Sequence, residues 1–181
     1  MIVIHIADER SALNNKEIGN EIFSCRNMQQ TYRNNPGNEI FPATENDYPQ
    51  LAEIWESAVK ATHDFLSRED MEAIASRLQS DYFPAVKLFV SRLADGTPVA
   101  FAGISEGHLE MLFVRNEFRG RGFGSRLLDF AIRQGVDSVD VNEQNPQALG
   151  FYLSHGFAVI SRDETDPDGR PYPILHLSLQ Q

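Results

Sequence analysis

Residues 119–125 read Arg-Gly-Arg-Gly-Phe-Gly-Ser, and this short stretch decides the fold that we expect. An apolar run at residues 109–114 precedes it, and apolar residues with helical spacing follow it from about Phe123 onward. The glycines therefore lie in a turn from a strand into a helix, where glycine lets the backbone approach a ligand closely. Unpaired N–H groups and the positive end of the helix dipole favour an anion at such a turn. Three basic residues add charge: Arg119, Arg121 and Arg126.

Two common phosphate motifs fit this stretch poorly. The dinucleotide motif G-x-G-x-x-G is matched by Gly120 and Gly122, and Asp140 follows at the distance expected for a ribose contact. Its last glycine is replaced by Ser125, however, and no early strand–helix–strand unit carries the motif. The P-loop motif also fails, because no lysine follows the glycines. A nicotinamide-dependent oxidoreductase therefore stays an alternative of lower rank.

The composition of the chain is that of an ordinary globular protein. Its 181 residues are enough for one domain with a core, and 41% of them are hydrophobic. The net charge of −10 argues against a nucleic-acid partner, which would require a basic face. No apolar run reaches the length of a membrane span, and the single cysteine, Cys25, excludes a disulfide within the chain. We expect a cytoplasmic protein without a membrane contact.

The first 37 residues differ from the rest of the chain. They contain little sustained periodicity and end in a cluster of turn-forming residues, Asn-Asn-Pro-Gly-Asn at 34–38. We expect residues 1–37 to form a poorly packed extension and residues 38–181 to form the functional domain.

Within that domain, strands and helices alternate in a mixed order. Strands are expected at 39–43, 86–93, 99–104, 108–114, 136–141, 157–161 and 174–179. Helices are expected around 51–59, from Ser67 to about 80, at 123–134 and at 146–154, the last capped by Asn145. Strands joined by tight turns pair antiparallel, whereas the helix between 108–114 and 136–141 makes that pair parallel.

Two motifs in the right order resemble the GNAT family of acetyl-CoA-dependent N-acetyltransferases. Arg119, Gly122 and Gly124 match its pyrophosphate loop, [Q/R]-x-x-G-x-[G/A]. Residues 142–157 match its longer C-terminal motif, N-x-x-N-x-x-A-x-x-x-Y-x-x-x-G-F. The segments at 62–66 and 171–173 resemble those of a bacterial subgroup, the YjaB-like acetyltransferases. The resemblance covers residues 39–179.

The resemblance implies an α/β fold with a mixed, mostly antiparallel sheet and helices on both faces. In that fold two parallel strands splay apart and the pantetheine arm of acetyl-CoA lies between them, which here means strands 108–114 and 136–141. No metal is expected, since no histidines show metal-ligand spacing. The residues implied in binding acetyl-CoA are Leu112, Phe113, Val114, Arg119, Gly120, Arg121, Gly122, Phe123, Gly124, Ser125 and Asn145.

The same resemblance assigns catalytic roles. Tyr152 matches the family's general acid, which protonates the departing thiolate. An ammonium acceptor must also lose a proton, and Glu110 and His108, two apart on one strand and so on one face, are the candidate bases. His63, Phe65 and Tyr172 are the candidate contacts to the acceptor.

The expected reaction is direct transfer of an acetyl group from acetyl-CoA to a primary amine in a ternary complex. Cys25 lies outside the matched region, which argues against an acyl-enzyme. The acceptor is either a small amine or a protein amino group, and the enzyme is expected to be a monomer or a homodimer. A non-catalytic acyl-CoA sensor is the first alternative, because it would retain the glycine loop without the chemistry.

Overall fold

The computed structural model describes residues 39–180, which form one seven-stranded sheet and the helices that cover it. The strand order is β1-β2-β3-β4-β5-β7-β6, and every neighbouring pair is antiparallel except β4 with β5. The mixed α/β fold class is thereby confirmed. The strands are β1 (Glu39–Pro42), β2 (Lys87–Arg92), β3 (Pro98–Ser105), β4 (His108–Val114), β5 (Ser138–Asn142), β6 (Phe157–Asp163) and β7 (Ile174–Leu179).

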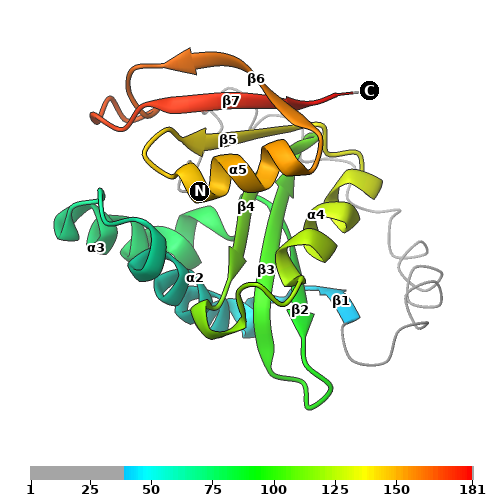
Figure 1. Cartoon of the computed structure of the whole chain (residues 1–181). Helices are drawn as coiled ribbons and strands as arrows, with labels where there is room; N and C mark the ends of the chain where they lie inside the picture. The colour runs from blue at the N-terminus through cyan, green and yellow to red at the C-terminus, as the bar shows by residue number, and fades with distance from the viewer. Residues whose placement is uncertain (1–38, 181) are drawn as a thin grey trace, which may run out of the picture.

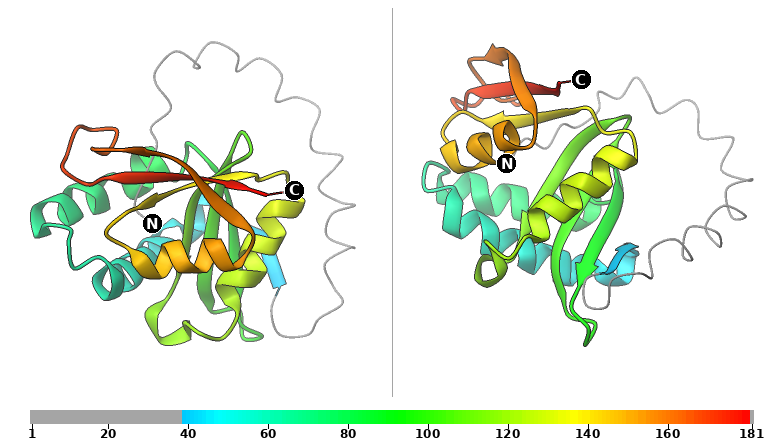
Figure 2. Two further views of the ribbon diagram at one scale, coloured as in Figure 1. Left: turned by 45° about the horizontal axis from the view of Figure 1, so that its top comes forward. Right: turned by 45° about the vertical axis from the view of Figure 1, so that its right-hand side comes forward.

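The parallel pair separates almost as soon as it forms. Between β4 and β5 the register contains two partner positions, His108 with Ser138 and Leu109 with Val139. Beyond them β5 continues in full register with β7, and β4 with β3, so the sheet divides at this point. Figure 2 shows the two strands running in different directions from their common end. The expected splay between them is confirmed.

Helices cover both faces of the sheet (Figure 1). On one face α4 (Phe123–Arg133) and α5 (Pro146–Ser154) pack on an apolar cluster that includes Leu127, Leu128 and Val139. On the other face α2 (Tyr48–Thr62) and α3 (Arg68–Arg77) pack on a second cluster around Trp55 and Phe101. Each large apolar side chain that is buried in this way contributes about 1.5–3 kcal/mol. The two clusters hold the glycine loop and both walls of the splay in place.

Local signals in the sequence account for most helix ends. Asn145 accepts a hydrogen bond from the backbone N–H of Ala148, so the predicted cap of α5 is confirmed, and Ser67 caps α3 by accepting one from Asp70. Strand β1, with Pro42, lies at the edge of the sheet, where proline is tolerated.

Several boundaries differ from the sequence-based expectation, among them those of β5, of the helix after Ser67 and of β6. β5 begins at Ser138 rather than at 136, because Gly135 and Val136 still donate hydrogen bonds to the last turn of α4. The helix after Ser67 becomes a π-helix at Leu78–Tyr82, which leads into Phe83. β6 continues to Asp163, two residues beyond its expected end, because Arg162 and Asp163 still pair with β7.

Two of the expectations concern the N-terminal extension and contact with a membrane. The poorly packed extension at residues 1–37, with Cys25, lies outside the described residues, so it stays an expectation. Within residues 39–180, no helix is long and apolar enough to cross a membrane.

Candidate active site

A cleft of about 420 Å³ opens where β4 and β5 separate. Its walls come from the end of α2, the end of β4, the glycine loop with the start of α4, and the first turns of α5. The cleft is therefore built at the one place where the sheet is interrupted. It is lined by Ala58, Thr62, His63, Leu112, Phe113, Val114, Phe118, Arg119, Gly120, Gly122, Phe123, Gly124, Ser125, Asn145, Gln147, Ala148, Phe151 and Tyr152.

The glycine loop turns through two left-handed residues, Gly120 with φ of 72° and Gly122 with φ of 82°. This conformation is available to glycine at little cost, and it brings the chain directly into the N-terminus of α4. The first N–H groups of a helix have no partner within the helix, and they point into the cleft together with the positive end of the helix dipole. These features fit a pyrophosphate group.

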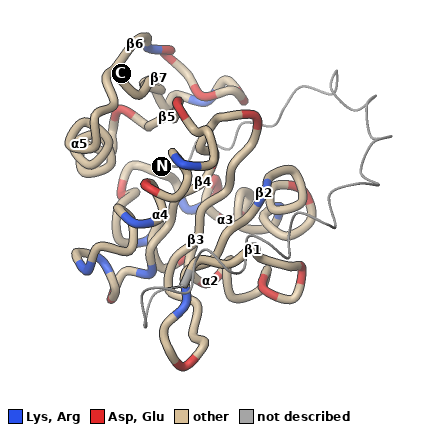
Figure 3. Tube along the Cα trace, turned by 90° about the vertical axis from the view of Figure 1, so that its right-hand side faces the viewer, with Lys and Arg blue, Asp and Glu red and all other residues tan. Residues whose placement is uncertain are grey.

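Arginine side chains surround this loop. A nitrogen of Arg119 lies 2.7 Å from Oε1 of Gln147 on α5, which joins the loop to the opposite wall. Arg121 lies over the ring of Phe118 and is not among the residues that line the cleft. Arg126 donates a hydrogen bond to the carbonyl of Arg121. Figure 3 marks the basic positions along the chain, several of which lie beside α4. An otherwise acidic protein is thus locally basic where an anion would bind.

Gly124 lines the cleft at the start of α4. A Cβ atom at this position would lie 3.6 Å from the ring of Phe151 and 3.7 Å from a methyl group of Val114, which are ordinary contact distances. The absence of a side chain therefore leaves the helix N-terminus open toward the cleft.

Tyr152, on α5, lines the cleft and is only 2% exposed. Its ring is held edge-on by Phe151 and Phe157, with ring centroids 5.1 Å and 5.7 Å away. Burial raises the pKa of the Tyr152 phenol. The hydroxyl therefore keeps its proton throughout the neutral range.

His63, at the end of α2, is also buried in the wall of the cleft. Thr62 donates its hydroxyl proton to the carbonyl of Ala58, so the Nδ1–H of His63 must donate to Thr62 Oγ1, 2.7 Å away. The other ring nitrogen, Nε2, then carries a lone pair and faces the side-chain nitrogen of Asn145 at 3.5 Å. Burial lowers the pKa of His63 to about 2, so this histidine is neutral.

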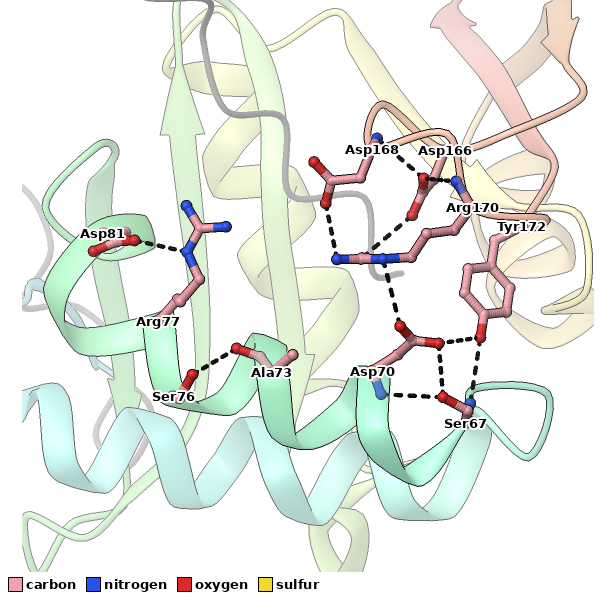
Figure 4. A network of polar contacts seen from close by, with 10 residues as sticks. All are labelled: Ser67, Asp70, Ala73, Ser76, Arg77, Asp81, Asp166, Asp168, Arg170 and Tyr172. Carbon is pink, nitrogen blue, oxygen red and sulfur yellow. Dashed lines mark hydrogen bonds and ion pairs between the residues drawn. The ribbon is translucent and has the colours of Figure 1, made fainter.

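Beyond His63 a row of rings leads to the β6–β7 loop. Phe65 lies 5.2 Å from the ring of His63 and 6.1 Å from that of Tyr172. Figure 4 shows how this loop is fastened to α3: the Tyr172 hydroxyl donates to Asp70 at 2.6 Å, and Arg170 lies 3.4 Å from the same carboxylate. We call these contacts the loop latch. The latch joins the β6–β7 loop to the first turn of α3, which follows residues 62–66 directly.

The two candidate bases lie outside the cleft lining. Ile104 pairs with Leu109 and Gly103 with Met111, so Glu110 is an extra residue in a β-bulge. The two neighbours of Glu110 accordingly belong to different core clusters, Leu109 to that of α4 and Met111 to that of α2. The expectation that His108 and Glu110 share a face assumed regular pairing along the strand, which the bulge interrupts. Their shared face therefore stays a prediction.

His108 belongs instead to a polar cluster behind the splay. Its Nδ1 lies 3.1 Å from the hydroxyl of Ser138, and its Nε2 lies 3.9 Å from the carboxylate of Asp140. The other oxygen of Asp140 lies 2.7 Å from Nδ1 of His176, whose Nε2 lies 3.1 Å from Asp163. Asp140, only 4% exposed, is thus enclosed by histidines. Asp140 is also not among the residues that line the cleft.

This cluster predicts a pH-dependent contribution to stability. Burial opposes a charge on His176, but the hydrogen bonds and charges of Asp140 and Asp163 outweigh it and raise the pKa of His176. Protonated His176 therefore stabilises the fold in full at pH values below the pKa of histidine in the unfolded chain, about 6.5. This contribution is lost as the pH rises through the pKa of His176 in the folded protein. In His176→Gln, which cannot titrate, the deficit in melting temperature should be largest near pH 6 and shrink toward pH 9. A deficit that is independent of pH would contradict this assignment.

The structure therefore brings most, but not all, of the predicted site residues together. Ten of the eleven cofactor candidates line the cleft with Tyr152 and His63, and Arg121 does not. Glu110, His108, Phe65 and Tyr172 lie outside the lining. Sequence reasoning missed Phe118, Gln147 and Phe151, although the position of Gln147 next to the Asn145 cap could have indicated it. Among residues 39–180, no group of three or more metal-ligating side chains is gathered.

Comparisons with known proteins agree with this geometry. The model of the acetyltransferase (GNAT) domain matches residues 50–172. The peptidyl-lysine N-acetyltransferase YjaB of Salmonella typhimurium is 40% identical over 129 residues, which cover 71% of this chain and 88% of that protein. YjaB of Escherichia coli is 39% identical over 130 residues, with the same coverage.

Two solved structures have the same fold. The solution structure of apo-YjaB from Escherichia coli aligns with a TM-score of 0.73 and 37% identity, over 78% of this chain and 96% of that one. The PaiA N-acetyltransferase of Thermoplasma acidophilum, solved with coenzyme A, aligns with a TM-score of 0.61 and 20% identity, over 79% and 99% of the two chains.

Proposed function

The chain belongs to the GNAT family and is an N-acetyltransferase similar to YjaB, and we propose that it moves an acetyl group from acetyl-CoA directly to the side-chain amine of a protein lysine. Transfer in a ternary complex needs one cleft that both reactants can reach. In this proposal residues 38–181 form the catalytic domain. The lysine acceptor is suggested by the YjaB relatives, which are peptidyl-lysine N-acetyltransferases.

The observation that supports the proposal most strongly is the cleft at the splay. A glycine loop leads into a helix N-terminus on one wall of the cleft, and a buried tyrosine lies on the wall formed by α5. The loop suits the pyrophosphate of acetyl-CoA, since backbone N–H groups can bind its oxygens without an intervening side chain. The apolar residues of β4 and α5 suit the pantetheine arm.

The acetyl carbonyl would be polarised by the backbone of β4. Beyond Leu109, the edge of β4 that faces β5 has no partner in the register between the two strands. Arg115 donates its N–H to Val99 next to β3, so by alternation the N–H groups of Leu112 and Val114 point to the opposite edge. They can therefore donate to the carbonyl oxygen, where negative charge develops during attack by the amine. The bond that forms joins the amine nitrogen to the acetyl carbon, and the bond that breaks is the thioester C–S bond.

Tyr152 would donate the proton that the departing thiolate requires. Its raised pKa keeps the phenol protonated at rest, and its fixed ring directs the hydroxyl without a loss of side-chain entropy. The pKa of a thiol is ordinarily about 8.5. The thiolate that forms in this apolar site is therefore a strong hydrogen-bond acceptor for the Tyr152 hydroxyl.

The acceptor would enter on the side of the loop latch. Lysine is an ammonium ion at neutral pH, and it must lose a proton before its nitrogen can attack. Glu110 in the bulge of β4 and His108 at its start are the groups proposed to take this proton, directly or through water. His63, Phe65 and Tyr172 would line the approach, where the row of rings can contact the apolar stem of lysine.

A thermal-stability measurement tests the ligand. With CoA or acetyl-CoA at 100 times the dissociation constant, the protein should be stabilised by about 2.7 kcal/mol, and NADH should have no effect. A lysine-containing peptide with acetyl-CoA should then release free thiol, whereas the same peptide with norleucine in place of lysine should not. Stabilisation by NADH alone, or CoA binding without turnover on any amine, would contradict the proposal.

A further inference from the structure

The loop latch connects two parts of the molecule that the sheet itself leaves apart. Helix α3 packs through Ile74 on the apolar cluster that it shares with β2, β3 and β4, whereas the β6–β7 loop belongs to the strands beyond the splay. The register between β4 and β5, which joins these two halves of the sheet, ends at Leu109. The latch is therefore a contact from one half of the divided sheet to the other, made by side chains rather than by strand pairing.

Asp70 is the centre of the latch, as Figure 4 shows. One of its carboxylate oxygens accepts two hydrogen bonds, from the Tyr172 hydroxyl at 2.6 Å and from the Ser67 hydroxyl at 2.7 Å. The other oxygen lies 3.4 Å from Nε of Arg170, whose guanidinium also pairs with carboxylates of its own loop. The hydrogen bond from Tyr172 is the main reason that the pKa of the Asp70 carboxyl is below its ordinary value. The carboxylate is thus ionised at neutral pH and holds both Tyr172 and Arg170.

Tyr172 connects Asp70 to the wall of the cleft. A phenol has a single proton, and that of Tyr172 is donated to Asp70, so this tyrosine offers its other neighbours chiefly its ring. The ring is buried, and its centroid lies 6.1 Å from that of Phe65, which in turn lies 5.2 Å from that of His63 in the cleft wall. Rings that are packed at such distances restrict one another's positions. Asp70 therefore fixes the outer end of a row of rings whose inner end lines the cleft.

We propose that Asp70 is a positioning residue for the acceptor amine, because by holding Tyr172 it keeps the row of rings where the apolar stem of a lysine can pack against it. This inference rests on the proposed function, in which the acceptor enters on the side of the latch. The groups for the cofactor lie elsewhere: Asp70 and Tyr172 are not among the residues that line the cleft, and α4 covers the opposite face of the sheet from α3 (Figure 1). Loss of the latch should therefore weaken binding of the acceptor and leave binding of CoA unchanged.

Steady-state kinetics with a lysine peptide and a calorimetric titration with CoA test the inference together. In Asp70→Ala the KM for the peptide should rise about 5–10-fold, whereas kcat at saturating peptide and the dissociation constant for CoA should stay within about twofold of the wild type. Tyr172→Phe keeps the ring and removes only the hydroxyl that donates to Asp70, so it should raise the KM in the same way. Because both substitutions remove one shared hydrogen bond, the double variant should have nearly the KM of Asp70→Ala alone.

Two further variants separate positioning from a general effect on the fold. Asp70→Asn loses the charge but keeps an oxygen that can accept from the Tyr172 hydroxyl, so the KM for the peptide should return most of the way to the wild-type value. Asp81→Ala is the matched control, because Asp81 pairs at 2.7 Å with Arg77 in the helical segment that follows Asp70 and not with the β6–β7 loop (Figure 4). Asp81→Ala should leave the KM for the peptide unchanged.

The outcomes distinguish this inference from the proposed function. A wild-type KM for the peptide in both Asp70→Ala and Tyr172→Phe, or an equal loss of affinity for CoA in these variants, would overturn the inference alone. If Asp70→Ala does not fold, Tyr172→Phe decides the question by the same measurements. A wild-type protein that binds CoA but acetylates no lysine peptide would overturn the proposed function.

Discussion

Gly124→Asp should abolish CoA binding while leaving the fold intact. The new carboxylate would point into the cleft beside the N-terminus of α4, where it would occupy the volume and satisfy the N–H groups intended for pyrophosphate. Repulsion between the carboxylate and the phosphates adds to the steric conflict. We expect the dissociation constant to rise by at least ~10²-fold, measured by calorimetry or by loss of the thermal shift.

Gly124→Ala is the matched control for this substitution. Its methyl group would lie 3.6–3.7 Å from Phe151 and Val114, which needs no movement of either side chain. Affinity should therefore fall only modestly, and both variants should melt cooperatively. If Gly124→Asp binds CoA as tightly as the wild type, the pyrophosphate does not lie at this loop.

Tyr152→Phe should lower turnover by ~10²-fold with little change in the affinity for acetyl-CoA. The substitution removes only the hydroxyl, so the packing of the ring against Phe151 and Phe157 is retained. Loss of kcat without a change in binding is the signature of an interaction that matters during proton transfer. Steady-state kinetics with a lysine peptide measure the turnover number, and a CoA titration measures the affinity.

Tyr82→Phe is a suitable comparison for Tyr152→Phe. Tyr82 is also buried, but it packs in the cluster beneath α2 and α3 rather than in the cleft. Loss of the Tyr82 hydroxyl should change the free energy of unfolding and leave the turnover number unchanged. If Tyr152→Phe behaves in the same way as Tyr82→Phe, Tyr152 is a packing residue and the thiolate obtains its proton elsewhere.

The parts of the fold that were predictable are those with a local cause. The caps at Ser67 and Asn145, the glycine turn at 119–125 and the period of each helix depend on residues within a few positions of one another. The extra residue at Glu110 leaves the alternation of buried and exposed residues along β4 unbroken. It shows only in how the strand pairs with β3, so the sequence pattern gave no sign of it.

Contacts between side chains far apart in the sequence could not be predicted either. Asp70 and Tyr172 are 102 positions apart, and Ser125 and His155 are 30 apart. No period or motif relates such positions, because only the packed sheet and helices bring them within a hydrogen-bond length. For this reason the cofactor half of the site could be predicted more fully than the acceptor half.

The position of β7 has a consequence for how the protein is made. Although β7 is the last strand in sequence, it lies between β5 and β6 and pairs with both. During synthesis on the ribosome, which proceeds from the N-terminus, β5 and β6 must wait with unpaired edges until Leu179 has been added. The half-sheet that contains β4 can assemble earlier, since each of its strands neighbours the next in sequence. The α5 wall of the cleft packs on the apolar cluster to which β5 and β7 contribute, so it is completed last. A nascent chain therefore acquires the ability to bind its cosubstrate only as synthesis of β7 ends.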